Sequence, residues 1–421
     1  MRSPTWRRSS VTLLASVVLL AACDSPADPQ PVPRIESLPR DLTTGELALV
    51  DAGEAFAFDF LREVVRAEDP AANVFVSPLS ASMALGMTLA GAEAGTFATM
   101  RAALRLEGLD REEIGTSYRS LIDLLSDLDP SVRMKIGNSV WHRMEFTLED
   151  SYVSEVERDF LARVEALDFD DPAAADVING WVDEATEGMI EAIVDPPIDP
   201  LTMAFLINAI YFEGQWTTRF DPTRTRSGDF FRSGGSTVTV PFMWMSDRAF
   251  PYAAAPSYQA IDLPYGGEAF SMTVLLPSGD ASVEDLIESL DADAWAGIIS
   301  GMGETELMVG LPKFRLEYGK TLNGVLRALG MGVAFDPAAA DFSRMHRDAL
   351  SLQLHISAVK QKAFVEVDEE GTRAAAVTSV EVGITSAPPS FVADRPFVFA
   401  IRERLSGTVL FTGVVRDPSA D

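Results

Sequence analysis

The 421-residue sequence predicts a single α+β domain, because helix signals concentrate in its first third and strand-like runs in its last third. Hydrophobic residues make up 47% of the chain, which supplies a large core and excludes a disordered protein. No internal repeat and no change of composition after residue 45 marks a second domain. One continuous domain is therefore expected from residue 45 to residue 421.

Residues 1–22 have the pattern of an export signal. Arginines at positions 2, 7 and 8 precede an apolar run at 11–22 that is too short to span a bilayer. The run ends in Leu-Ala-Ala-Cys, which resembles a bacterial lipobox and implies that Cys23 becomes the lipidated first residue. An ordinary signal followed by an incidental cysteine is the alternative. Residues 23–44, rich in Pro, Asp and Ser, are predicted to form a flexible tether.

These features predict an exported protein. It would be lipid-anchored to a bacterial cell envelope, on the periplasmic or cell-surface side, and would touch the membrane through that anchor only.

Several helices are predicted from capping residues and from apolar residues at helical spacing. Ser77 and Pro78 suit the N-cap and first position of a buried helix over 79–89. Apolar residues at helical spacing predict further helices over 56–65 and 114–125. Another helix is predicted over 178–194, ended by two prolines.

Strands are predicted where short apolar runs lie between turn signals. Several of these runs are apolar on both faces, as in strands buried between two layers. They cover 204–212, 272–276, 307–311, 364–367, 397–401 and 409–415.

The composition excludes several classes of protein. The formal net charge of −29 lacks the basic footprint of a nucleic-acid-binding protein. A single cysteine excludes internal disulfides and a cysteine-based zinc site, and three histidines leave little for a metal centre. No metal and no cofactor are therefore expected.

Sequence motifs for catalysis are missing. The chain has no G-x-S-x-G, H-E-x-x-H or G-x-x-x-x-G-K-[ST] pattern. The acidic run from Asp168 to Asp176 lacks the glycine that a calcium loop needs at its sharp turn. We therefore do not expect an enzyme, and a hydrolase or sugar-processing lipoprotein of another fold is only a remote alternative.

The segment 369–389 is the most informative part of the chain. It is long for a loop inside a domain, and such loops are usually functional or disordered. Every second residue is small and uncharged, so the segment could enter a sheet as a strand; these residues are Thr372, Ala374, Ala376 and Thr378. Taken alone, the segment could equally be a plain surface loop.

Six ordered motifs show that the chain resembles the serpin family from about residue 45 to residue 418. They are NVFVSPLS at 73–80, INGWV at 178–182, NAIYFEGQW at 208–216, LPKF at 311–314, EEGT at 369–372 and RPFVF at 395–399. The resemblance implies one domain with three β-sheets, eight or nine helices and an exposed reactive-centre loop at about 369–390.

The function implied by this resemblance is inhibition of serine endopeptidases, with cysteine endopeptidases as an extension. The protease cuts the loop as a suicide substrate, and the cut loop inserts into the central sheet and traps the enzyme. A non-inhibitory, membrane-tethered serpin acting as a binding or scaffold protein is the alternative.

Residue roles follow from the matched motifs. The family's hinge corresponds to Glu369, Gly371, Thr372, Ala374, Ala376 and Thr378. The breach at the top of the sheet corresponds to Lys313, which pairs with Glu369, and to Trp216. The shutter beneath the sheet centre corresponds to Ser77, Ser80 and Asn208, with Gln361 where many members have histidine.

Family spacings counted from both ends of the loop place the scissile bond at Thr385-Ser386, with Ile384-Thr385 as the second choice. These residues suit an elastase-like or subtilisin-like protease with a small apolar primary pocket. No Arg or Lys occurs at 374–394, which argues against a trypsin-like target. The protein is expected to be a monomer.

Overall fold

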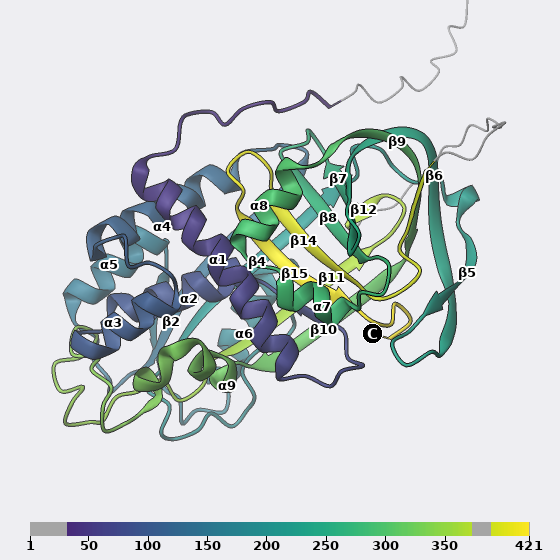
Figure 1. Cartoon of the computed structure of the whole chain (residues 1–421). Coiled ribbons are helices and arrows are strands. Elements are labelled where there is room, and N and C mark those ends of the chain that lie inside the picture. The colour runs from purple at the N-terminus through teal and green to yellow at the C-terminus, as the bar shows by residue number, and fades with distance from the viewer. Residues whose placement is uncertain (1–31, 373–388, 421) are drawn as a thin grey trace, which may run out of the picture. The chain divides into compact units, whose positions relative to one another are not determined.

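The computed structural model describes residues 32–372 and 389–420, and Pro33–Asp421 forms one compact unit. Nine α-helices lie in the described part of this unit (Figure 1). Their bounds are α1 (Thr44–Arg66), α2 (Pro78–Ala90), α3 (Ala94–Ala103), α4 (Arg111–Ser126), α5 (Asp150–Phe160), α6 (Ala174–Ala185), α7 (Val283–Ser289), α8 (Ala292–Ser300) and α9 (Asn323–Leu326).

Local capping chemistry sets where the first helices begin. The Thr43 hydroxyl accepts the Glu46 N–H, and the Glu46 carboxylate accepts the Thr43 N–H, so α1 starts with a capping box. The Ser77 side chain caps α2 with Pro78 at its first position, as predicted. The predicted helices over 56–65, 79–89 and 114–125 are confirmed as parts of α1, α2 and α4.

A six-stranded sheet forms the centre of the unit, in the order β10-β11-β12-β4-β2-β3. In the described part of the chain, β11 and β4 are joined only through the two residues of β12. The bounds are β2 (Val132–Arg143), β3 (Arg163–Leu167), β4 (Ala204–Gln215), β10 (Phe314–Thr321), β11 (Lys360–Val367) and β12 (Gly371–Thr372).

A nine-stranded sheet holds the other strands, in the order β1-β15-β14-β8-β7-β6-β9-β13 with β5 paired to β6. The third expected sheet is contained in it: β5, the first half of β6, the end of β9 and β13 lie beyond a register shift at Met245/Arg248. The bounds are β1 (Val74–Val76), β5 (Arg226–Phe231), β6 (Thr237–Ala254), β7 (Tyr258–Tyr265), β8 (Phe270–Pro277), β9 (Gly303–Pro312), β13 (Ser390–Val392), β14 (Phe397–Glu403) and β15 (Val409–Val415).

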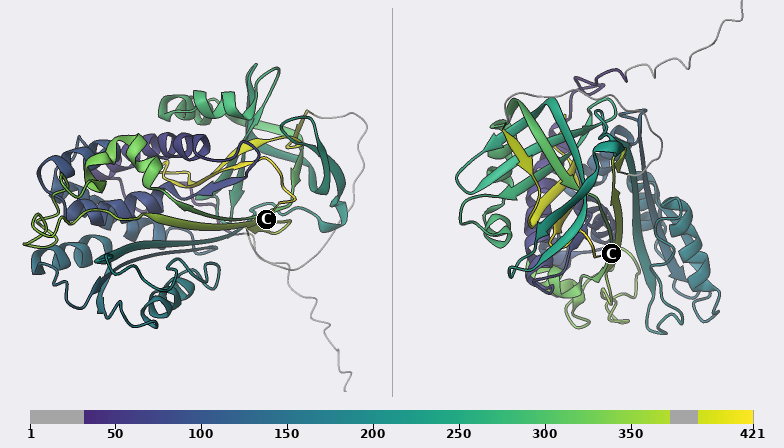
Figure 2. Two further views of the ribbon diagram at one scale, coloured as in Figure 1. Left: turned by 90° about the horizontal axis from the view of Figure 1, so that it is seen from below. Right: turned by 90° about the vertical axis from the view of Figure 1, so that its right-hand side faces the viewer.

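The six-stranded sheet is covered on both faces. Its main-core face packs on α2 and the nine-stranded sheet, through residues such as Ile210 and Val365. Its other face packs on α6, where Trp141 and Ile207 meet Ile178. Figure 2 shows helices on both sides of this sheet. Burial on both faces explains why the predicted strands read as continuous apolar runs.

The predicted helix over 178–194 is too long, since α6 ends at Ala185. Thr186 closes it by donating its hydroxyl to the Val182 carbonyl, and Gly188 then takes a positive φ of 79°. The Asn179 carboxamide oxygen accepts the N–H groups of Ile193 and Val194, which fixes the following loop against the helix. The Asn179 contacts join residues 14 and 15 positions apart, so they leave no signal in the helical spacing of apolar residues.

The predicted tether also differs from the structure. Residues 33–43 belong to the compact unit, where Arg40 pairs with a buried glutamate and Ile35 and Leu38 pack against the core. Cys23 and the signal at 1–22 lie outside the described residues. Within the described part, no helix has the length and apolar character needed to cross a membrane.

Candidate functional site

The point where a new strand could enter lies between β4 and β11. The short strand β12 pairs antiparallel with both neighbours: Gly371 faces Gln215, and Thr372 faces Gly214 on one side and Val367 on the other. Below Thr372, no described strand lies between β4 and β11. The first residues of the expected exposed loop are therefore buried in the sheet, with Thr372 only 4% exposed.

Gly371 is required by the closeness of the neighbouring strand. A Cβ atom on Gly371 would lie 2.1 Å from the Gly214 carbonyl oxygen and 2.6 Å from the Gln215 Cα. These are backbone atoms that cannot turn aside, so only glycine fits here. The role proposed for Gly371 as a hinge thus has a steric basis in the uncut protein.

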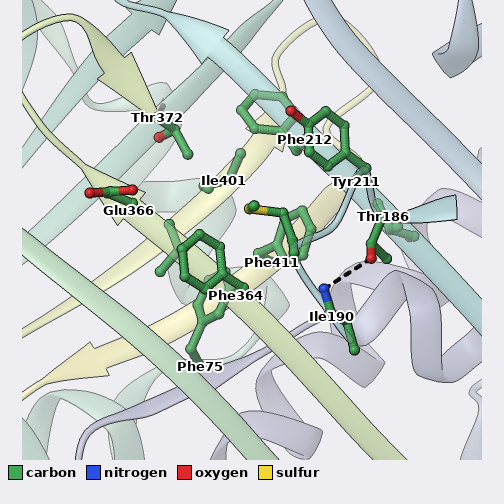
Figure 3. Close-up of a pocket in the computed structure, with 13 residues that line it drawn as sticks. Phe75, Thr186, Ile190, Tyr211, Phe212, Phe364, Glu366, Thr372, Ile401 and Phe411 are labelled. Carbon is green, nitrogen blue, oxygen red and sulfur yellow. Dashed lines mark hydrogen bonds between the residues drawn. The ribbon is translucent and has the colours of Figure 1, made fainter. Parts of the chain in front are cut away.

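A small cavity lies directly below β12 (Figure 3). Its walls come from β4 and β11, from the segment that follows α6, and from β1, β14 and β15 of the other sheet; they include Phe212, Phe364, Thr186, Phe75 and Phe411. The cavity volume is only about 20 Å³, about the space of one water. A strand can therefore enter only if β4 and β11 separate.

Lys313 and Glu369 form the ion pair that the resemblance implies. Lys313 Nζ lies 2.7 Å from Glu369 Oε2, and Thr225 donates its hydroxyl to the other carboxylate oxygen at 2.7 Å. Burial would raise the pKa of Glu369, but the hydrogen bonds from Lys313 and Thr225 outweigh it and hold that pKa below its ordinary value. The carboxylate is thus kept charged at the point where β12 begins.

Trp216 lies beside this pair and fixes the turn before β12. Its indole N–H donates to the Asp368 carbonyl at 2.9 Å, and its backbone N–H donates to the Glu370 carbonyl at 2.8 Å. Its ring stacks on Tyr265 with centroids 4.5 Å apart. The Tyr265 hydroxyl in turn lies 2.7 Å from the Thr372 hydroxyl.

Tyr265 and Thr225 were missed by the sequence analysis. Each is more than a hundred residues from its partner in the loop, and neither stands in a motif. Burial raises the pKa of Tyr265, so its hydroxyl stays protonated and can take part in the bond to Thr372.

The expected shutter residues do come together beneath the sheet centre. The Gln361 amide donates to the Ser77 carbonyl at 2.8 Å and accepts the Ser77 N–H at 3.3 Å, so it ties β11 to the start of α2. The Ser77 hydroxyl donates to the Leu410 carbonyl, and the Ser80 hydroxyl donates to the Asn208 carbonyl. Both polar atoms of the Gln361 carboxamide thus have a hydrogen-bond partner on the β11 side of the insertion point.

Asn138 is a further member that the sequence analysis missed. Its carboxamide oxygen accepts from Asn208 Nδ2 at 2.8 Å, while its own amide donates to the Phe160 carbonyl at 2.7 Å. Asn138 and Asn208 are directly opposed on β2 and β4, which the sequence does not reveal without the register. The Asn208 carboxamide oxygen is buried and has no donor among the described residues.

Several predicted residues cannot be placed. Ala374, Ala376, Thr378, Thr385 and Ser386 lie outside the described residues. Over the described ranges there is no cluster of three or more His, Cys, Asp or Glu that could hold a metal.

Comparison with known proteins identifies the family. The sequence model described as "Serpin (serine protease inhibitor)" matches residues 51–418. The chain belongs to the serpin family. Intracellular coagulation inhibitor 2 of Tachypleus tridentatus is 34% identical over 354 residues, covering 82% of this serpin and 86% of that protein. Iripin-2 of Ixodes ricinus is 33% identical, covering 88% and 94%.

The fold of this serpin agrees with solved structures. The native state of the thermophilic serpin tengpin matches with a TM-score of 0.80 and 28% identity, covering 92% of this chain and 97% of that chain. The predicted α+β serpin fold is therefore confirmed.

Proposed function

We propose that this serpin inhibits serine endopeptidases, and by extension cysteine endopeptidases, as a suicide substrate whose cut loop inserts between β4 and β11. The observation that carries the proposal is that β12 begins a strand between β4 and β11, while below Thr372 no described strand lies between the two. Serpins named as inhibitors among the relatives, such as the coagulation inhibitor, support the same reading.

The register of β12 defines which residues an inserted strand would oppose. Thr372 pairs with Gly214 and Val367. Continued antiparallel pairing brings position 374 opposite Phe212 and Val365, position 376 opposite Ile210 and Ala363, and position 378 opposite Asn208 and Gln361. Side chains alternate between the two faces along a strand. The neighbours on β4 lie an even number of residues from Gly214, and those on β11 lie an even number from Val367. They therefore face the same side of the sheet as Thr372.

The loop sequence suits these neighbours. Alanine at 374 would enter between Phe212 and Val365, and alanine at 376 would enter beside Ile210; larger residues would clash with these side chains. Thr378 would bring a hydroxyl between two carboxamides, one of which, Asn208, offers a buried oxygen without a donor among the described residues. A sequence selected only as a surface loop has no reason to match the register in this way.

Insertion is favourable because it completes a sheet. Each new main-chain hydrogen bond contributes a net ~1 kcal/mol, and the entering side chains are buried between two layers. In the uncut chain both ends of the loop are held, by β12 and by β13. Cleavage near Thr385-Ser386 would release one end, so proteolysis would trigger insertion.

The finer parts of the proposal concern the target and the location. Thr385 or Ile384 at the cut suits an elastase-like or subtilisin-like protease with a small apolar pocket. A lipid on Cys23 would hold the inhibitor on a bacterial cell envelope, where it could protect envelope proteins from secreted proteases. In the alternative, a non-inhibitory tethered serpin, the loop would never insert.

Thermal unfolding before and after cleavage tests the mechanism. The full chain would be nicked between Ser379 and Pro389 by any protease that cuts there, and both forms heated under the same conditions. We expect a large rise in the melting temperature of the nicked form, because the inserted strand completes the sheet. An unchanged melting temperature would overturn the proposal and leave the tethered binding protein as the explanation. Heat- and detergent-resistant complexes with elastase-like and subtilisin-like proteases would then identify the target class.

A further inference from the structure

Residues 33–40, here called the strap, precede α1 and lie outside the matched family region of 51–418. The strap runs from the start of α1 toward the turn that joins β7 to β8, residues 266–269; it is the purple segment ahead of α1 in Figure 1. Its two ends make specific contacts with different parts of the unit. A segment that served only as a spacer would need neither contact.

The first end of the strap lies against the β7–β8 turn. The Ile35 N–H donates to the Gly267 carbonyl at 2.7 Å, and Arg34 pairs with Glu268 at 3.1 Å. The approach is close enough that a Cβ on Gly267 would lie 2.8 Å from the Pro33 carbonyl oxygen. Ile35 adds apolar contact with the core.

The other end is anchored to two helices. Arg40 forms a bidentate pair with Glu46 of α1 at 2.6 and 2.8 Å, and also donates to Ser120 of α4 at 2.7 Å. The Glu46 side chain is fully buried. The hydrogen bonds from Arg40 lower the pKa of Glu46 to about 2, so the pair stays charged over the physiological range.

The β7–β8 turn also holds the strands beside the insertion gap. The Gly266 N–H donates to the Gln215 carbonyl at the end of β4, and Thr217 donates its hydroxyl to the Gly266 carbonyl. The Gly267 N–H donates to the Asp129 carboxylate at 2.9 Å, just before β2. Tyr265, at the start of the turn, contacts both Trp216 and Thr372.

We propose that the strap fastens the β7–β8 turn to α1 and α4 and thereby keeps the top of β4 next to β12, so that it slows opening of the sheet. The inference rests on the proposed function, since opening matters because a strand has to enter. The small cavity below β12 means that β4 must move away from β11 before insertion. A docked strap restrains that movement through Gly267, Gly266 and Gln215, and its release removes the restraint.

Two variants of the full chain test the strap from its two ends. Ile35→Pro removes the N–H that binds Gly267, and Ile35→Val is its matched control because it keeps that N–H and nearly the same side chain. Arg40→Met removes the anchor on Glu46 without touching the turn. The readout is amide hydrogen exchange at Trp216 and Phe220, whose N–H groups bond the Glu370 and Glu369 carbonyls.

We expect exchange at these two amides to rise roughly fivefold in Ile35→Pro and Arg40→Met, the factor that the loss of about one net hydrogen bond contributes. Insertion after nicking, followed by the change in total tryptophan fluorescence, should accelerate by a similar factor, while Ile35→Val behaves as the unaltered chain. Unchanged exchange at Trp216 and Phe220 in both variants would overturn the strap and leave the proposed function standing. A missing thermal shift on cleavage would instead overturn the proposed function, whatever the exchange shows.

Discussion

Gly371 lies so close to Gly214 that a Cβ atom would come within 2.1 Å of the Gly214 carbonyl oxygen. The two glycines lie at the only place where the described chain bridges β4 and β11. Their close approach lets β12 lie between β4 and β11, and below β12 these two strands enclose only the small cavity. The turn that leads into β12 thus depends on glycine at both positions, because neither residue carries a Cβ atom.

Replacement of Gly371 by alanine should push β12 out of the sheet. The added methyl meets backbone atoms that cannot rotate away, so we expect a loss of about 1–3 kcal/mol in unfolding free energy of the uncut protein. Denaturant unfolding measures it. Gly297→Ala in α8 is the control, because its Cβ would have nothing within 4 Å and should be neutral or slightly stabilising. Equal effects of the two changes would contradict the steric role of Gly371.

Under the proposed function, Thr372→Arg should turn this serpin from a protease trap into a mere substrate. The side chain is 4% exposed and its hydroxyl bonds Tyr265, so an arginine would bury an unpaired charge. We expect cleaved inhibitor in place of covalent protease complex on a denaturing gel, and a lower melting temperature of the uncut form. Thr372→Ser keeps the hydroxyl and should retain complex formation. If Thr372→Arg still formed the covalent complex at the normal level, the side chain of residue 372 would not need to be buried for the loop to insert.

Local signals predicted much of the fold. Ser77-Pro78 predicted the start of α2, and apolar runs predicted six strands, because capping and burial act over a few neighbouring residues; these strands are β4, β8, β9, β11, β14 and β15. The end of α6 escaped prediction because Asn179 reaches across to Ile193. The strap escaped for a similar reason: its composition is that of a tether, and it is fixed to the domain by long-range contacts, of Arg40 with buried Glu46 and of Ile35 with Gly267.

Only the site residues that are matched to a family motif could be predicted from the sequence. The pair of Lys313 and Glu369 joins residues far apart in sequence, and the resemblance alone brought them together. Tyr265 and Asn138 have no motif, and their roles depend on the register of β7 and β2 against their neighbours. Register is set by the packed sheets as a whole, so it cannot be deduced from one strand.

Loss of the Lys313–Glu369 pair should make the breach open more easily. The pKa of Glu369 lies below its ordinary value, so the pair stabilises the uncut form above the unfolded pKa near 4.5 and is lost as pH falls below it. Since Lys313 is 37% exposed, we expect Lys313→Ala to cost at most ~1 kcal/mol. Faster hydrogen exchange at the Trp216 amide, and an unfolding free energy that depends less on pH below 4.5, would support this. Lys313→Arg is the control, because it should largely retain the ion pair. Identical acid profiles of Lys313→Ala and the unaltered chain would refute it.

Glu54 should make the protein less stable as pH rises toward neutrality. Burial first, and the charge of Asp51 second, raise the pKa of Glu54 to about 7, against the opposing charge of Arg402. Between pH 4.5 and 7 the folded state keeps a proton that the unfolded chain has released, so stability falls as pH rises through this window and levels off above it.

The effect should be on the order of 2 kcal/mol, and Glu54→Gln should remove it, since the amide stays neutral at every pH. Denaturant unfolding from pH 4.5 to 8 measures the difference, with Glu112→Gln on the exposed face of α4 as control. If Glu54→Gln keeps the slope of the unaltered chain, another group is responsible. If the slope disappears, a single side chain on α1 makes the stability of the uncut serpin depend on pH near neutrality.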